Sequence, residues 1–323
     1  MKEQKELINS SKKKISFTWN TQTVILLVLI AMWAFLAFAT DNFFTLPNIQ
    51  NILRQVTIQG VNAVGVTLVI ITAGIDLSIG SVVALVNILF ATLLVGGSPI
   101  WISILLVLAL AMGLGFVNGF FVHQFRVPPF IATLAMMSIA RGAALLISGG
   151  RNVFGLPRSI ANFSSGTFLG IPNLFWFLIL VIVFMEILLR RTTFGRYVYA
   201  VGSNPEAARL SGVNIRWVII GVYMIAGFLW GLSGILETSR IWMGVPSTGT
   251  GYELDAIAAA VLGGASLMGA QGSAIGAFLG AMVMTTIYNG SVLLNINPFW
   301  QRIIVGIILV ITVSIDQMRT RRK

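Results

Sequence analysis

A carboxylate lies between apolar runs in the first third of the chain. Asp76 is followed by the hydroxyl of Ser78, and Gly74 and Gly80 flank the two residues. An ionisable group at membrane depth is costly unless it is paired or hydrated, so this residue type in this setting indicates a water-filled path for a solute. A structural explanation stays open, because Ser78 can cap the next helix while Asp76 lies in a turn at a membrane surface. The glycines permit either a broken helix or a turn.

Two amides and a glycine pair extend this set of candidates. Gly263 and Gly264 precede Ser266 and are typical of a helix break, at which backbone carbonyls and amides can face a pore. Asn87 and Asn118 lie within apolar stretches, where their amides can line a path or bind neighbouring helices. The candidate translocation path therefore comprises Asp76, Ser78, Asn87, Asn118, Gly263, Gly264 and Ser266.

Other glycines are spaced for helix packing. Gly272, Gly276 and Gly280 recur at every fourth residue, which predicts one helix face that approaches a neighbouring helix closely. Gly115 with Gly119, and Gly227 with Gly231, repeat this spacing elsewhere in the chain. Packing explains these glycines without a ligand.

A polar segment in the second half of the chain predicts a short capped helix. Its residues are Asn204, Pro205, Glu206, Ala207, Ala208, Arg209, Leu210, Ser211 and Gly212. The asparagine can cap the helix, the proline suits its first position, the glutamate complements the helix dipole and the glycine favours a left-handed end. Two turns of helix outside the bilayer are suited to docking a soluble partner, although a surface helix against lipid headgroups is the alternative.

Residue types that carry covalent catalysis or bind metals are scarce. The 323 residues include no Cys and a single His, His123, which excludes thiolate metal sites, disulfides and cysteine nucleophiles. The sequence has no Gly-rich phosphate loop followed by Lys, no His pair at helical spacing and no GxSxG motif. We therefore expect no catalytic residue, no metal site and no cofactor on this chain. If ATP drives the protein, another subunit must bind it.

The elements that position these residues are predicted to be membrane-spanning helices. Hydrophobic residues make up 57% of the chain and charged residues only 10%, which excludes a water-soluble globule. About 20 apolar residues cross the ~30 Å hydrocarbon core, so the uncharged stretches predict about ten helices. We expect them within residues 23–40, 55–75, 77–125 (two helices), 127–148, 168–185, 217–236, 256–301 (two helices) and 299–315.

The predicted fold class is accordingly an all-α integral membrane protein with broken or half-span segments. The stretch 256–267 is short enough to be a half-helix rather than a crossing. No linker or polar block divides the chain, so residues 1–323 form a single predicted transmembrane domain.

The net charge of +11 reports topology rather than nucleic-acid binding. With ten crossings and a cytoplasmic N-terminus, most of the 21 Lys and Arg residues lie on the cytoplasmic side, as the positive-inside rule requires. Both termini are therefore predicted to be cytoplasmic. The cytoplasmic segments are expected to be a basic tail at 1–21, a loop at 192–216 and a second basic tail at 317–323.

Ordered segments of the chain resemble permease subunits of bacterial ABC importers for simple sugars, and among them most closely the ribose permeases. They are residues 67–81, 130–134, 195–197, 206–212, 252–258 and 263–267. The resemblance runs from about residue 41 to residue 316, and residues 246–255 look especially like the ribose branch.

This resemblance implies a multi-pass protein of the bacterial plasma (inner) membrane that moves a monosaccharide, ribose being favoured, by alternating access. It implies a homodimer, a cytoplasmic ABC ATPase that holds ATP and Mg²⁺, and an extracytoplasmic sugar-binding protein. Residues 204–212 would form the ATPase-coupling loop. Membrane lipid is a further expected contact, and nucleic acid is not a predicted partner.

Alternative functions stay open at this point. The solute could be another pentose, a hexose, an autoinducer-type sugar or a branched-chain amino acid. An ion-coupled secondary transporter would need ionisable residues near the bilayer midplane, where the chain offers mainly Asp76, Arg141 and Arg302. A membrane-embedded enzyme is disfavoured by the scarcity of catalytic residue types.

Overall fold

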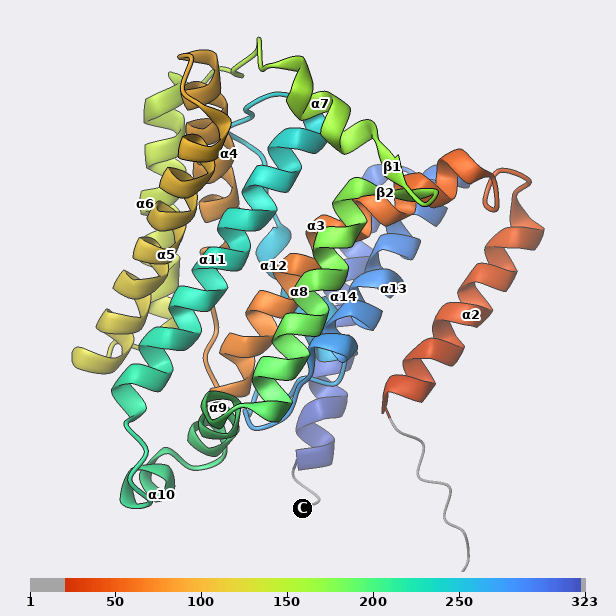
Figure 1. The fold of residues 1–323 in the computed structure, drawn as a ribbon. Coiled ribbons are helices and arrows are strands. Elements are labelled where there is room, and N and C mark those ends of the chain that lie inside the picture. Colours follow the sequence, from red (N-terminus) through yellow and green to blue (C-terminus); the bar gives the residue numbers. More distant parts are fainter. Residues whose placement is uncertain (1–20, 321–323) are drawn as a thin grey trace, which may run out of the picture.

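The computed structural model describes residues 21–320, and within that part the protein is a helical bundle with one short hairpin (Figure 1). Eight helices are long and apolar enough to cross a membrane. They are α2 (Thr21–Ala39), α3 (Leu46–Ile71), α5 (Ile100–Gln124), α6 (Pro129–Ser148), α8 (Asn173–Arg191), α11 (Ile215–Ile241), α13 (Ala274–Leu293) and α14 (Pro298–Thr320). One shorter apolar helix, α4 (Ile79–Val95), and the short helix α12 (Tyr252–Leu262) lie where the other two helices were predicted. The all-α membrane fold is therefore confirmed.

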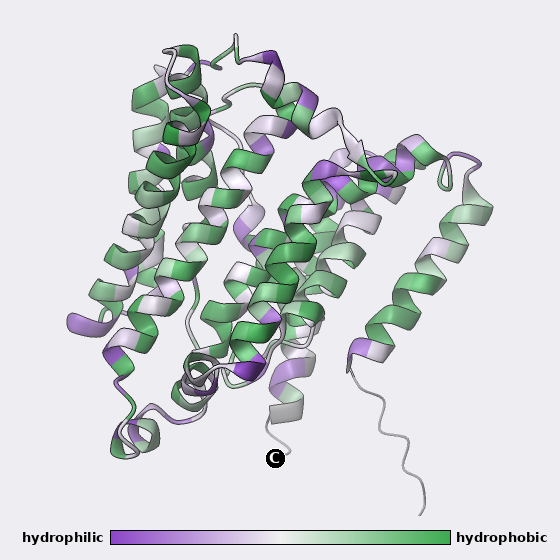
Figure 2. Ribbon diagram, in the orientation of Figure 1, coloured by the Kyte–Doolittle hydropathy of each residue, from purple (hydrophilic) through white to green (hydrophobic). Residues whose placement is uncertain are grey.

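Helices α3, α11 and α13 form the centre of the bundle and are the most deeply buried of the long helices. Most of α3 is buried, and α11, α8, α12 and α13 pack around it. α2 contributes far fewer buried residues and lies at the edge (Figure 1). Figure 2 shows hydrophobic residues along the lengths of the helices, with hydrophilic residues gathered mainly toward the two ends of the bundle.

The described ends of the chain lie at the same end of the bundle. In Figure 1 the start of α2, the end of α14 and the short helix α10 (Pro205–Leu210) all lie at the lower end. An even number of membrane crossings places the two ends of a chain on the same side. The predicted tail at 1–21 lies outside the described residues except for Thr21. The predicted tail at 317–323 begins inside α14, and its residues 321–323 lie outside them.

The opposite end of the bundle is covered by short elements. Helix α7 (Arg158–Ser165) is followed by β1 (Thr167–Phe168) and β2 (Ile171–Pro172). The two strands pair antiparallel, with Phe168 opposite Ile171. These elements connect α6 to α8 across the upper end of the bundle (Figure 1).

Two crossings are broken in a related way. After α3, residues 72–78 are not helical until α4 begins, and after α11, residues 242–251 are largely non-helical until α12 begins. The start of α4 meets the second break directly, because a Cβ built on Gly80 would overlap the carbonyl oxygen of Gly249. Both short helices therefore begin inside the bundle, where the two breaks touch.

Glycines provide the close helix contacts. A Cβ on Gly115 of α5 would overlap the backbone of Tyr223 in α11, and one on Gly227 of α11 would overlap that of Ala111 in α5. On α13, Gly280 is pressed against the backbone of Ala259 in α12 in the same way. These contacts agree with the packing role predicted from the spacing.

The predicted glycine stripe differs in one member. Gly276 and Gly280 lie on α13, but Gly272 precedes the helix, because Ser273 caps it by accepting a hydrogen bond from the Gly276 N–H at 3.0 Å. Gly272 instead faces the side chains of Ile71 and Thr67 in α3. Gly272 lies outside the helical repeat because the capping side chain of Ser273 fixes the start of α13 after it.

Candidate coupling helix and translocation path

The predicted capped helix is present as α10. The Asn204 side chain accepts a hydrogen bond from the Ala207 N–H at 3.0 Å, and Pro205 occupies the first helical position. After the helix, Gly212 adopts a φ of +84°, the left-handed conformation that glycine favours. Leu210 is 76% exposed at the end of the bundle. The helix thus presents polar groups and one apolar side chain away from the protein.

Glu206 and Arg209 form an ion pair on the exposed surface of α10. The guanidinium donates three hydrogen bonds to the carboxylate, at 2.5 to 3.2 Å. These bonds and the positive charge of Arg209 lower the pKa of Glu206 below its usual 4.5. The pair is fully exposed, so its contribution to stability is small. Its main consequence is a fixed arrangement of charge on a short helix.

A second helix, which the sequence reasoning missed, anchors α10 to the bundle. Helix α9 (Thr193–Ser203) precedes α10, and Thr192 caps it by accepting from the Gly195 N–H at 3.1 Å. The Tyr199 hydroxyl donates to the Gly272 carbonyl at 2.7 Å. A Cβ on Gly202 would overlap the Ile71 carbonyl oxygen at the end of α3. The Thr192 cap followed by apolar residues was the available sequence signal.

Asp76 lies at the first break and is completely buried. Its Oδ1 accepts hydrogen bonds from the Ser78 N–H at 2.7 Å and from the Ser78 hydroxyl at 2.6 Å. Asn118 of α5 donates to the same hydroxyl at 3.3 Å. From α6, the Thr133 hydroxyl accepts the Leu77 N–H at 3.1 Å. The structure thus brings Asp76, Ser78 and Asn118 together as a network that braces the start of α4.

Asn87 lies apart from the Asp76 network and forms hydrogen bonds with the backbone of the second break. Its amide nitrogen donates to the Thr238 hydroxyl at 2.8 Å and to the Met243 carbonyl at 3.1 Å, and its oxygen accepts the Val245 N–H at 2.6 Å. An amide that donates and accepts at once can satisfy backbone groups that a broken helix leaves free. Asn87 is buried within the protein, so it does not face an open path in this conformation.

The glycine pair and Ser266 lie in the turn that follows α12. A Cβ on Gly263 would overlap the Gly276 backbone, and Gly264 has a φ of +92°. The Ser266 hydroxyl and the Leu267 N–H donate to Asp316 Oδ2 of α14 at 3.0 and 3.2 Å. This part of the turn therefore packs between α13 and α14, while its later residue Gly269 lies against Ala73 in the first break.

The first turn of α12 gathers ionisable residues that the candidate list did not include. The Tyr252 hydroxyl donates to buried Glu237 of α11 at 3.2 Å. Asp255 accepts from Tyr288 of α13 at 2.6 Å and from Gln59 of α3 at 3.5 Å. Acidic residues in a first helical turn are favoured by the helix dipole. Glu253 and Asp255 directly precede the uncharged stretch 256–301, and this position was the sequence signal that could have identified them.

Arg141 of α6 lies against the second break. One terminal nitrogen of its guanidinium donates to the carbonyls of Pro246 at 2.6 Å and Thr248 at 2.8 Å. Non-helical backbone has free carbonyls, which explains a charged donor inside a predicted span. Across residues 21–320, His, Asp and Glu side chains form no group of three or more that could hold a metal ion.

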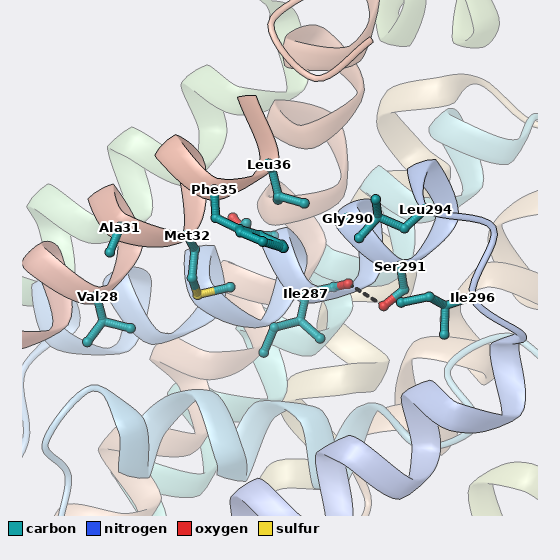
Figure 3. Close-up of a pocket in the computed structure, with 11 residues that line it drawn as sticks. Val28, Ala31, Met32, Phe35, Leu36, Ile287, Gly290, Ser291, Leu294 and Ile296 are labelled. Atoms are coloured by element: carbon teal, nitrogen blue, oxygen red, sulfur yellow. Dashed lines mark hydrogen bonds between the residues drawn. The ribbon is translucent and has the colours of Figure 1, made fainter. Parts of the chain in front are cut away.

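A groove of about 450 Å³ lies between α2 and α13, away from these polar groups. Figure 3 shows Val28, Met32 and Phe35 of α2 facing Ile287 and Gly290 of α13. Its lining is almost entirely apolar, with Thr286 and Ser291 as the polar members. Such a groove suits hydrocarbon rather than a hydrophilic solute, so it is not part of the candidate path.

Comparisons of the sequence with known proteins match permease components of transport systems. The sequence model of the family described as "Branched-chain amino acid transport system / permease component" matches residues 48–313. The ribose import permease protein RbsC of Escherichia coli strain K12 is 37% identical over 314 residues, covering 96% of this chain and 98% of that protein. RbsC of Bacillus subtilis strain 168 is 38% identical over 318 residues, covering 98% of this chain and 99% of that protein.

A permease named for another sugar is also similar. The galactose/methyl galactoside import permease protein MglC of Haemophilus influenzae is 35% identical over 335 residues, covering 98% of this chain and all of that protein. No solved structure matches the chain.

Proposed function

The chain belongs to the family of branched-chain amino acid transport system permease components, and we propose that it is the transmembrane subunit of an ATP-driven importer of ribose. The observation that carries this proposal is the identity of 37–38%, over nearly the whole chain, to ribose import permeases of two distant bacteria. The galactose permeases are slightly less similar, which favours ribose over a hexose. The relatives are transport components, and this chain is one as well rather than an enzyme.

The partners follow from this function. A cytoplasmic ABC ATPase would bind ATP and Mg²⁺, since this chain has no phosphate loop of its own. An extracytoplasmic sugar-binding protein would deliver the solute. Two copies of the chain would form a homodimer in the bacterial inner membrane, with both termini and α10 on the cytoplasmic side, as the distribution of Lys and Arg favours.

The coupling step is assigned to residues 204–212. Their helix projects from the bundle, and α9 ties it to the end of α3 and to the turn after α12. Closure of an ATPase pair would displace α10 and, through α9, these inner segments. The path would then open to one side at a time.

A pull-down of the tagged permease from its native membrane tests this proposal. We expect an ATPase and a binding protein to copurify, and we expect ribose to raise the thermal stability of the binding protein. A binding protein stabilised by a branched-chain amino acid instead would contradict the assigned solute. A chain that transports in liposomes without ATP or partners would contradict the importer mechanism.

A further inference from the structure

We propose that the sugar path runs along the second break, at residues 246–254, and that Glu253 and Arg141 contact the sugar hydroxyls. The inference rests on the proposed sugar-import function and names the site within it. Neither residue belongs to the buried network around Asp76. The argument depends on which of the two breaks is open to the outside of the protein.

The two breaks differ in exposure. In the first, Gly74, Asp76 and Ser78 are buried, and the exposed residue is the apolar Ala73. In the second, Ser247 and Thr250 are exposed. Hydrocarbon cannot satisfy the hydrogen bonds of irregular backbone, so such backbone occurs at membrane depth only where protein covers it or water reaches it. Asp76 and Ser78 of the first break meet this condition inside the protein, whereas the exposed hydroxyls of the second break require a water-filled path or a covering surface.

The second break lies deep within the bundle. It touches Gly80 at the start of α4 and ends where α12 begins. From this junction α4 runs about 25 Å toward the upper end and α12 about 16 Å toward the lower end, at ~1.5 Å per residue (Figure 1). The break starts near the upper end, where Gly244 pairs with Val153, and descends past the exposed hydroxyls of Ser247 and Thr250 to this junction.

Charged groups of opposite sign lie on this face. Arg141 is half-buried and uses one nitrogen to hold the break, and Glu253 is close enough for the two charges to interact. A Cβ on Gly80 would lie 2.9 Å from Glu253 Oε2, which places the carboxylate at the N-terminus of α4. Among residues 21–320, no hydrogen bond or ion pair occupies this carboxylate, which is partly exposed.

These groups match a neutral polyhydroxylated solute. A carboxylate accepts hydrogen bonds from sugar hydroxyls, and a guanidinium donates to sugar oxygens. The hydroxyls of Ser247 and Thr250 can do either, while Leu254, 50% exposed, offers an apolar contact for C–H groups. The two charges balance, so the face does not select a charged solute.

Thiol accessibility tests the inference directly, because the chain has no Cys. We would introduce Ser247→Cys and Thr250→Cys singly into the complete importer, with its ATPase and binding protein, in proteoliposomes. Leu180→Cys is the matched control, since Leu180 is 65% exposed on α8 but lies on an unbroken helix. A charged, membrane-impermeant methanethiosulfonate is the probe.

We expect the reagent to block ribose uptake by both break variants at least about tenfold faster than it modifies the control, since only an aqueous path admits it. Ribose-loaded binding protein with ATP should slow the block. Break variants that resist the reagent but cross-link between two copies would indicate a dry dimer interface and would overturn the inference. Uptake by the unsubstituted importer in the same vesicles reports on the proposed function separately.

Substitution of the carboxylate gives a second readout. We expect Glu253→Gln to lower ribose uptake about tenfold, while ATPase activity stimulated by the binding protein persists, because the loss concerns the solute and not the coupling. Membrane content and thermal stability of the variant control for misfolding. Unchanged uptake and an unchanged KM for Glu253→Gln would remove Glu253 from the site.

Discussion

Three buried or partly buried carboxylates in this protein satisfy backbone groups that helix starts and turns leave free. Asp76 accepts the Ser78 N–H, and Glu186 of α8 accepts the N–H groups of Ala274 and Ile275 at the start of α13, at 3.0 and 3.3 Å. Asp316 accepts the Leu267 N–H in the turn after α12. A buried N–H without a partner is destabilising, and a carboxylate is a strong acceptor for it. Glu253 is partly exposed beside Arg141 and takes part in no hydrogen bond or ion pair among residues 21–320, which is why it attracts a functional interpretation.

For Asp76, we predict that Asp76→Ala lowers the free energy of unfolding by about 2 kcal/mol, because it leaves the buried Ser78 N–H and hydroxyl without their acceptor. Asp76→Asn keeps an acceptor and should lose less. Thermal unfolding of the purified protein in detergent measures both, with Asp41→Ala at an exposed position as the control. A variant with unchanged stability that no longer transports would show that Asp76 acts on the solute instead.

At the scale of the element, α10 is a helix of six residues that cannot be stable by itself. Its Asn204 cap, the Glu206–Arg209 ion pair and the burial of Ala208 hold it in place. Its exposed residues are free to dock a partner because none of them is needed for packing. The charged residues of α10 would therefore also form the surface that meets the proposed ATPase.

We predict that Glu206→Lys or Arg209→Glu uncouples ATP hydrolysis from uptake while leaving the permease inserted. The double variant Glu206→Arg/Arg209→Glu restores an ion pair within the helix but reverses the charges that a partner meets. If α10 docks the ATPase, the double variant should stay uncoupled. Recovery of coupling would instead assign the pair a role in helix stability alone. ATP hydrolysed per ribose transported is the measurement.

The pH dependence of this coupling also follows from α10. Arg209 lowers the pKa of Glu206 below 4.5 in the folded protein. The ion pair therefore stabilises α10 at any pH above the pKa that Glu206 has in the unfolded chain. This stabilisation is lost only as the pH falls through the lower pKa of Glu206 in the folded protein. We expect the coupling ratio to stay constant between about pH 8 and pH 5.5. A loss of coupling centred near neutral pH would contradict control by this carboxylate.

At the scale of the whole molecule, the segment at the lower end connects the docking helix to the inner breaks. The Ala270 N–H donates to the Ile71 carbonyl at 2.8 Å, and Gly202 is pressed against the same carbonyl. The Tyr199–Gly272 hydrogen bond joins α9 to this turn. Packed segments move together rather than deform, so displacement of α9 is transmitted to α3 and the turn after α12.

We predict that Gly202→Ala lowers ribose uptake by about tenfold, because overpacking against the Ile71 carbonyl costs about 1–3 kcal/mol and shifts α9. The ATPase should still copurify with the variant, since α10 keeps its own residues. Gly113→Ala is the matched control, because Gly113 also lies within a helix but has open space around its Cβ position. Equal uptake by the two variants would contradict transmission through this contact.

Local properties of the sequence were enough to predict the long apolar helices and the cap of α10, but not the short helices α7 and α9. Hydrophobicity along the chain identifies membrane-spanning helices because hydrocarbon requires every backbone group to bond within its own segment. Asn204, Pro205 and Gly212 act within a few residues, so their spacing predicts the bounds of α10. The spacing of Gly115 and Gly227 likewise predicts close packing, although not which helix each one meets.

Only the tertiary structure determines which polar residues are covered and which are open. Asp76 and Glu253 are both carboxylates beside apolar stretches, yet the first is buried by α5 and α6 while the second is partly exposed beside Arg141. Arg141 meets Pro246 across 105 positions of the chain, a contact that no local pattern encodes. Exposure depends on how distant helices pack, and for that reason the sequence alone identifies the polar residues without assigning their roles.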